Sequence, residues 1–289
     1  MIAQPTSHHF RSQRLDLHYN GWGNPEAPPL LLIHGLRDHG RAWDPVARTF
    51  ARDFHVIAPD LRGHGDSAWP SDGNYAMSGF VFDLAELLDH LHLDHVPLVG
   101  HSLGGNISLR YAAAFPEHVH KLVVMEGIGA APEVAAKSEA VPVSQKMRTW
   151  VDKRRKGLER TARTFPTLAD ATDRMHKANP HLTADLAAHL TLHGTKPVEG
   201  GLTWKFDPLL QTMMPEDFSH AQKMAMMADI QAPTLLIYGD DSWASNPRND
   251  GRMDHFRDVR LQTFPEAGHW VHHDAPDAFY TTVMEFLRD

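Results

Sequence analysis

A serine flanked by glycines, at the point where an apolar run gives way to a helical pattern, constrains this 289-residue chain most. Residues 96–99 predict a buried strand, and residues 103–112 carry apolar side chains at helical spacing. Ser102 lies between them in the motif G-x-S-x-G at residues 100–104. A serine on so tight a strand-to-helix turn has a strained backbone, and small flanking residues keep its side chain accessible. The pattern predicts an exposed nucleophile at Ser102.

The chain on either side alternates buried strands with amphipathic helices. Apolar runs predict strands at residues 29–33, 54–58, 121–125 and 233–238, and residues 260–264 are the last predicted strand. Such runs suit strands that are buried on both faces. With helical patterns between them they indicate βαβ units, so we expect an α/β fold with a mainly parallel sheet and helices on both faces. Residues 11–19, which a Gly- and Asn-containing turn follows, indicate an antiparallel edge strand or hairpin.

The pattern changes between residues 128 and 229. Strand runs disappear, and helical stretches are predicted at residues 143–156, 167–177 and 183–192, with a less regular one after Trp204. The segment is rich in Leu, Met and aromatic residues, which need a surface to bury against. We therefore interpret residues 128–229 as a helical insertion. Residues 1–127 and 230–289 form the core in this interpretation.

Charge and composition argue against several classes of partner. The chain has 28 Lys and Arg against 36 Asp and Glu, a net charge of -8, so nothing favours nucleic acid or an anionic membrane. No stretch approaches the roughly 20 apolar residues of a membrane span. Residues 1–5 lack the charged start and apolar core of a secretion signal. We therefore expect a cytoplasmic protein without membrane contact.

Cysteine and histidine usage bears on metal chemistry. The chain has no cysteine, which excludes disulfides, thiolate zinc sites and cysteine nucleophiles. It has 22 histidines, but close pairs such as His8-His9 and His272-His273 lack the carboxylate and the spacing of a metal site. We therefore expect no metal.

The candidate chemical residues all follow predicted strands, where sites of parallel α/β sheets form. They are His34-Gly35, Ser102, Glu126, Asp241 and His269. A serine hydroxyl needs a histidine to take its proton and a carboxylate to orient that histidine. His269, in the loop before the last helix, is the best-placed base. The backbone N–H groups of Leu36 and Leu103 are the expected donors to a tetrahedral oxyanion.

Four motifs together resemble the α/β-hydrolase superfamily. They are HGL at 34–36, DLRGHGDS at 60–67, GHSLGG at 100–105 and AGHW at 267–270. The resemblance covers nearly the whole chain and is greatest to serine hydrolase-like proteins of the branch that also holds haloalkane dehalogenases and epoxide hydrolases. It implies the α/β-hydrolase fold, with a mostly parallel eight-stranded sheet and with residues 128–229 as a helical cap.

The resemblance also bears on the reaction. Dehalogenases and epoxide hydrolases use an aspartate at the position of Ser102, so the serine argues against both. It indicates instead hydrolysis of an ester, lactone, thioester or amide through an acyl-enzyme, without metal or organic cofactor. We expect a small-molecule ester as substrate, small to medium and apolar. The alternatives are lactone, thioester or carbon-carbon bond hydrolysis or perhydrolase chemistry on the same triad, and a protein that binds a small hydrophobic ligand without turnover.

The sequence leaves the acid of the triad open. Most members of the superfamily carry it three residues past the glycine that follows the strand at 233–238, and this chain has Ser242 there. Asp241 lies one residue short, and Asp240 is a weaker candidate. Some cap-bearing dehalogenases carry the acid directly after the preceding strand, where this chain has Glu126. Glu126 and Asp241 are equally supported.

Aromatic residues near the strand ends are candidates for the substrate pocket. Trp43, Trp243 and Trp270 are expected to line it, with Trp204, Phe206, Met213 and Met214 as further candidates from the insertion. Nothing in the sequence indicates an oligomeric state.

Overall fold

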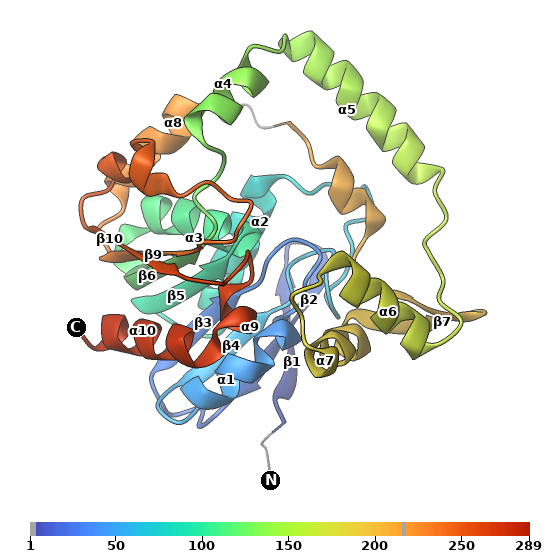
Figure 1. Cartoon of the computed structure of the whole chain (residues 1–289), viewed down its shortest axis with the longest axis horizontal. Helices are drawn as coiled ribbons and strands as arrows, with labels where there is room; N and C mark the ends of the chain where they lie inside the picture. Colours follow the sequence, from blue (N-terminus) through green and yellow to red (C-terminus); the bar gives the residue numbers. More distant parts are fainter. Residues whose placement is uncertain (1–3, 216–217) are drawn as a thin grey trace.

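The computed structural model describes residues 4–215 and 218–289 (Figure 1). Met1, Ile2 and Ala3, on which the expectation of a cytoplasmic protein partly depends, lie outside the described residues. The described strands include eight that form one sheet, in the order β1-β2-β4-β3-β5-β6-β9-β10. These are β1 (Thr6–Ser12), β2 (Leu15–Trp22), β3 (Pro29–Ile33), β4 (His55–Pro59), β5 (Val96–His101), β6 (Val119–Met125), β9 (Thr234–Gly239) and β10 (Val259–Phe264).

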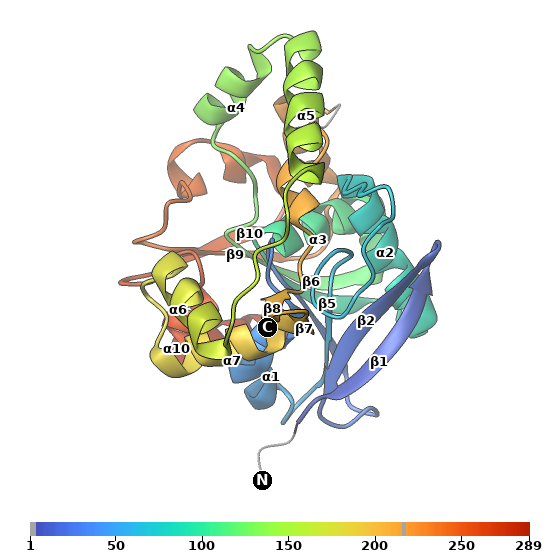
Figure 2. The same cartoon turned by 90° about the vertical axis from the view of Figure 1, so that its right-hand side faces the viewer.

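Strand direction in the sheet agrees with the sequence prediction. From β4 to β10 every neighbouring pair is parallel, and β2 pairs antiparallel with both β1 and β4. The edge hairpin of β1 and β2 begins at Thr6, earlier in the chain than the predicted strand, and lies along one side of the molecule (Figure 2). The mostly parallel eight-stranded sheet is therefore confirmed.

Helices cover both faces of the sheet. One face is covered by α2 (Met77–His90) and α3 (Leu103–Ala114). The other face is covered by η1 (Gly40–Trp43), α1 (Asp44–Phe50), α9 (Val271–Asp274) and α10 (Pro276–Arg288) (Figure 1). Phe80, Leu84 and Leu87 of α2 are buried at the spacing that puts them on one side of the helix. Each such side chain contributes roughly 1.5–3 kcal/mol when fully buried. Packing on both faces therefore fixes the strand ends in space.

The segment between β6 and β9 is mainly helical. It contains α4 (Pro132–Glu139), α5 (Val143–Leu158), α6 (Leu168–Ala178), α7 (Ala184–Gly194), β7 (Thr195–Val198), β8 (Gly201–Trp204), η3 (Pro208–Thr212), α8 (His220–Ala225) and η4 (Met226–Asp229). The helices α5, α6 and α7 form where the sequence predicts them. The helical stretch expected after Trp204 consists of short pieces, and residues 216–217 within it lie outside the described residues.

The helix α4 and the strands β7 and β8 of this segment were not predicted. β7 and β8 pair as a hairpin whose two-residue turn is Glu199-Gly200, with Gly200 at φ 81°. Strands of four residues are too short for a clear alternation, so the glycine turn was the available signal. Within residues 4–215 and 218–289, no helix combines the length and apolarity needed to cross a membrane.

Candidate active site

Ser102 occupies the turn between β5 and α3 in a strained conformation. Its φ is 51° and its ψ is -111°, a region that non-glycine residues rarely adopt. Its N–H donates to the carbonyl of Met125 at 2.8 Å. A Cβ atom on Gly104 would lie 2.2 Å from the carbonyl oxygen of Ile33, and one on Gly100 would lie 2.6 Å from the backbone of Gly104. Both glycines are therefore needed for the turn to close with Ser102 at its tip.

The loop after β3 approaches Ser102 closely. A Cβ atom on Gly35 would lie 3.3 Å from Cβ of Ser102. His34 fixes this loop, because its Nε2 accepts the N–H of Leu61 at 3.0 Å while its Nδ1–H donates to the carbonyl of Gly35 at 2.7 Å. Leu36 follows in this loop, and Leu103 is the first residue of α3, where an N–H has no partner within the helix. The two predicted oxyanion donors thus belong to segments that meet at the serine.

His269 is hydrogen-bonded to Glu126. Its Nδ1 lies 2.9 Å from Oε2 of Glu126, and the two side chains are 6% and 0% exposed. Oε1 of Glu126 accepts the N–H of Gly239 at 2.9 Å, and the hydroxyl of Ser242 donates to Oε2. Because the carboxylate occupies Nδ1, Nε2 of His269 is the nitrogen that can accept a proton. Glu126 has φ 57°, so the backbone turns sharply where β6 ends.

Asp241 lies apart from this pair. Its side chain is exposed, and its N–H donates to the carbonyl of Ala267 at 3.0 Å. Within the described residues, the carboxylate that contacts His269 is that of Glu126. Ser242, at the position where the superfamily usually carries the acid, contributes a hydroxyl to the same carboxylate. The sequence marked Ser242 only as a missing acid and gave no sign that it donates to Glu126.

His101 is a further residue of the site. Its contacts there could not be predicted from the sequence. Its Nε2 lies 3.0 Å from the carbonyl oxygen of His269, so this imidazole donates a hydrogen bond to the backbone of the candidate base. Its ring also packs on the rings of His269 and Trp270. Burial, with the neighbouring His269 and His273, lowers the pKa of His101 well below its ordinary value. His101 is therefore a neutral donor at physiological pH.

Arg252 fixes the loop after β9 against the loop after β6. The side chain is 1% exposed and donates to the carbonyls of Gly129 and Ser245, each at 2.7 Å. Its charge is balanced by Asp250 at 2.7 Å. These two loops carry Ser242 and Glu126, so the buried guanidinium holds their relative position. No motif in the sequence indicates this role.

No hydrogen bond among the described residues joins the Ser102 hydroxyl to His269. The ring of His269 instead lies between Trp243, at a centroid distance of 4.6 Å, and Trp270, at 5.0 Å. Trp243 is 78% exposed and covers the imidazole from the solvent side. Catalytic hydrogen bonds often tighten only once substrate is bound, so His269 stays the predicted base.

A cavity of about 310 Å³ lies between the core and the inserted segment. Its core side includes Leu36, Arg37 and Trp270, and its other side includes Arg174, Trp204 and Phe206. Trp270, Trp204 and Phe206 therefore line this cavity, and their role in a substrate pocket stays a prediction. Trp43 does not match the expectation: it is fully buried in the core, with its ring 6.4 Å from that of Phe279. The apolar character of a tryptophan does not distinguish a residue of the core from a residue that lines a pocket.

Two groups of side chains have the composition of metal ligands. They are Asp44 with His189 and His193, and His18 with Asp60 and Asp66. The Asp44 carboxylate already pairs with Arg41 at 2.7 Å and with Arg48 at 3.0 Å. These two positive charges oppose a cation there.

The fold agrees with the comparisons with known proteins. The family model described as alpha/beta hydrolase fold matches residues 28–276. The chain therefore belongs to the α/β-hydrolase family, and it is a hydrolase of that family.

Similar proteins carry several hydrolytic activities. The chain is 25% identical over 279 residues to a serine hydrolase-like protein of Danio rerio, covering 92% of this chain and 83% of that one. It is 28% identical over 281 residues to 2-hydroxy-6-oxo-2,4-heptadienoate hydrolase of Pseudomonas putida, covering 94% and 92%. The thioesterase domain from the curacin biosynthetic pathway superposes with a TM-score of 0.85 at 26% identity, covering 98% of this chain and 100% of that domain.

Proposed function

We propose that this protein is a serine hydrolase that cleaves carboxylic esters through an acyl-enzyme. Ser102 is the nucleophile, His269 the base and Glu126 the acid in this proposal. The observation that carries it is the bond of 2.9 Å between His269 Nδ1 and Glu126 Oε2, beside a serine at φ 51°. A buried carboxylate fixes the tautomer that leaves Nε2 of His269 free to take a proton.

The reaction follows from these positions. Ser102 Oγ attacks the ester carbonyl while its proton passes to Nε2 of His269. The ionised Glu126 stabilises the imidazolium, and the N–H groups of Leu36 and Leu103 bind the oxyanion. His269 then gives its proton to the departing alcohol. A water molecule, activated by the same imidazole, cleaves the acyl-enzyme and releases the acid.

The cavity suggests the size and character of the acyl group. Trp204, Phe206 and Trp270 offer apolar surface, which suits a small to medium hydrocarbon chain. Arg37 and Arg174 also line the cavity, and guanidinium groups bind carboxylates in a bidentate manner. In this proposal residues 128–229 act as the cap over the site. An acyl chain with a terminal carboxylate should therefore be accepted as well as a neutral one.

Thioester or carbon-carbon bond hydrolysis is the second candidate. It is favoured by the similarity to a thioesterase domain and to 2-hydroxy-6-oxo-2,4-heptadienoate hydrolase. Both reactions can use the same serine, histidine and acid.

Two panels of substrates, each built on one acyl group, test ester against thioester hydrolysis. Neutral and carboxylate-bearing acyl chains are offered as p-nitrophenyl esters, as alkyl esters and as thioesters, and kcat/KM is compared between wild type and Ser102→Ala. Ester turnover that depends on Ser102, with labelling of Ser102 by a fluorophosphonate, supports the proposal. Folded protein in which Ser102 is not labelled and no substrate is hydrolysed would leave a ligand-binding role.

A further inference from the structure

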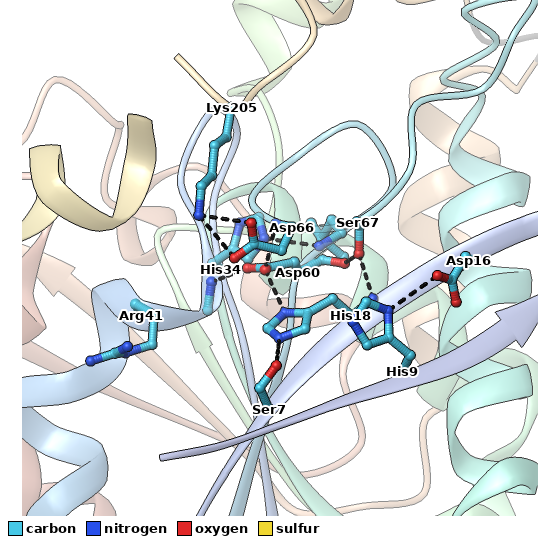
Figure 3. Close-up of polar contacts among 12 residues, drawn as sticks. Ser7, His9, Asp16, His18, His34, Arg41, Asp60, Asp66, Ser67 and Lys205 are labelled. Atoms are coloured by element: carbon cyan, nitrogen blue, oxygen red, sulfur yellow. Dashed lines mark hydrogen bonds and ion pairs between the residues drawn. The ribbon is translucent and has the colours of Figure 1, made fainter. Parts of the chain in front are cut away.

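A second series of serine, histidine and carboxylate lies at the edge hairpin, away from Ser102. Ser7 Oγ of β1 is 2.8 Å from Nε2 of His18 on β2, and Nδ1 of His18 is 2.8 Å from Oδ2 of Asp60, which follows β4 (Figure 3). The His18 and Asp60 side chains are 4% and 2% exposed, whereas Ser7 is exposed. This is the arrangement that activates a serine hydroxyl: a base within hydrogen-bond reach, itself oriented by a third group.

The proton positions follow from the contacts of Asp60. Its Oδ1 accepts the N–H of Gly40 at 2.6 Å, and its Oδ2 accepts the N–H of Asp66 at 2.9 Å. Burial opposes its ionisation, but the hydrogen bonds that Asp60 accepts from His18 and from the N–H of Gly40 outweigh burial and lower the pKa of Asp60 below its ordinary value. An ionised carboxylate only accepts hydrogen bonds, so Nδ1 of His18 carries the proton. In the neutral imidazole, Nε2 is then the acceptor of the Ser7 hydroxyl.

The backbone of His18 is fixed by hydrogen bonds, and the strand register determines which face its side chain occupies. The N–H of His18 donates to Ser67 Oγ at 2.8 Å, and Ser67 donates in turn to the carbonyl of Asp60. The hairpin register pairs His9 with His18 and Ser7 with Asn20, so the side chains of Ser7 and His18 lie on the same face of the two strands. The base is therefore preorganised under a serine that faces solvent.

We propose that Ser7 is a second activated serine, which takes an acyl group from small activated acyl donors such as aryl esters. Its Oγ attacks the carbonyl carbon, and its proton passes to Nε2 of His18 and then to the departing phenolate. An O–C bond to Ser7 forms, the bond to the phenolate breaks, and a phenol leaves. Ser7 lies within a paired strand rather than at a helix N-terminus, so the ester on Ser7 should persist rather than turn over rapidly.

The test uses Ser102→Ala protein, which removes the nucleophile of the proposed hydrolase. It is treated with p-nitrophenyl acetate, and acetylation is followed by intact mass and by peptide mapping. Ser71, an exposed serine in a loop, is the internal control. We expect Ser7 to be acetylated about 100-fold faster than Ser71, since general bases contribute typically 10²–10⁴-fold. His18→Gln in the same background should reduce the rate at Ser7 to that at Ser71, and Ser7→Ala should abolish the adduct.

Equal rates at Ser7 and Ser71 in Ser102→Ala would overturn the proposal, and this comparison requires no change to the His18 network. A folded His18→Gln variant that still acetylates Ser7 at the full rate would overturn it as well. Because the adduct is mapped to a residue, the outcome is independent of whether Ser102 is the main nucleophile. Failure of the proposed hydrolase would instead appear as wild-type protein with no labelling at Ser102.

Discussion

The two series of serine, histidine and carboxylate in this molecule differ in an instructive way. The series of Ser7 is joined by hydrogen bonds from end to end, whereas in the series of Ser102 the bond lies between His269 and Glu126. Ser102, however, lies on a strained turn at a helix N-terminus, close to Gly35 of a second loop. The hydrogen bonds of the Ser7 series hold a base against the serine hydroxyl before any substrate binds. Oriented N–H donors determine which attack leads to turnover.

The two series also share a segment of chain. Asp60 orients His18 in one of them, and the next residue, Leu61, donates its N–H to His34, which fixes the loop of Leu36 beside Ser102. The turn after β4 thus supports both serines through neighbouring residues. Variants of this turn are poor tests of either serine, so the predictions on activity below use residues that belong to one series.

The largest expected effect separates the two serines by turnover. Ser102→Ala should lower kcat for an ester substrate by about 10⁴-fold or more, because the covalent route is lost. Ser7→Ala should change kcat by less than about 2-fold, because its acyl ester is not cleaved rapidly. Steady-state release of p-nitrophenol, measured after the first equivalent of product, checks both. A large loss of kcat in Ser7→Ala, with little change in Ser102→Ala, would show that Ser7 and not Ser102 is the nucleophile of turnover.

The next effect concerns the acid. Glu126→Gln should lower kcat by about 10⁴-fold, as expected when an amide replaces the carboxylate that sets the tautomer of the base. Asp241→Asn is the matched control and should stay within about 2-fold of wild type, since the Asp241 side chain is exposed. Single-turnover acylation rates of the two variants decide the matter. Mild, equal losses would reject Glu126 as the acid.

Ser242→Ala should have an intermediate effect. It removes a hydroxyl that donates to Oε2 of Glu126 but leaves the N–H of Gly239 on Oε1. A hydrogen bond to a charged group contributes about 1.5–3 kcal/mol, so kcat/KM should fall by about 10-fold to 150-fold. Ser242→Thr keeps the hydroxyl and should recover most of the activity. Activity in Ser242→Ala equal to wild type would show that this donor is dispensable.

The smallest effect concerns the stability of the shared turn. Burial and the neighbouring His34 lower the pKa of His64 to about 3, whereas the pKa in the unfolded chain is about 6.5. Between these two pH values His64 binds a proton in the unfolded chain but stays neutral in the folded protein. The contribution of His64 to the free energy of unfolding is therefore fully present above about pH 6.5 and decreases as the pH falls. From pH 6.5 to 5 one such histidine lowers the free energy of unfolding by about 2 kcal/mol.

Urea unfolding at pH 7 and at pH 5 measures this loss. A folded His64→Gln variant should show a smaller difference between the two pH values than wild type does. A wild-type protein that is more stable at pH 5 would contradict the expected sign.

The sequence predicted the fold more fully than the site. Apolar runs identified the strands β3, β4, β5, β6 and β9, because these strands are buried on both faces, whereas β10 is mostly exposed or half-buried. The acid could not be chosen, because Glu126 and Asp241 follow neighbouring strands whose carboxyl ends meet. The choice depends on loop conformation: φ 57° accompanies the inward Glu126, while the N–H of Asp241 binds Ala267 and its side chain faces solvent.

The series at Ser7 shows a second limit of sequence analysis. Ser7, His18 and Asp60 belong to three different strands or strand ends, and a shift of one residue in the hairpin would put Ser7 on the opposite face. The register between β1 and β2 depends on all the residue pairs of the hairpin together. No motif in the sequence marks it.

The position of the inserted segment has a consequence for how this chain can change. It leaves the sheet at β6 and returns at β9, and these strands are paired neighbours from Leu122 with Thr234 to Met125 with Ile237. The entropy of closing a loop grows only with the logarithm of its length. Lengthening or replacing the insertion should therefore cost the pairing little. Glu126 and His269, 143 residues apart in the chain, can keep their hydrogen bond while the segment over the cavity diverges.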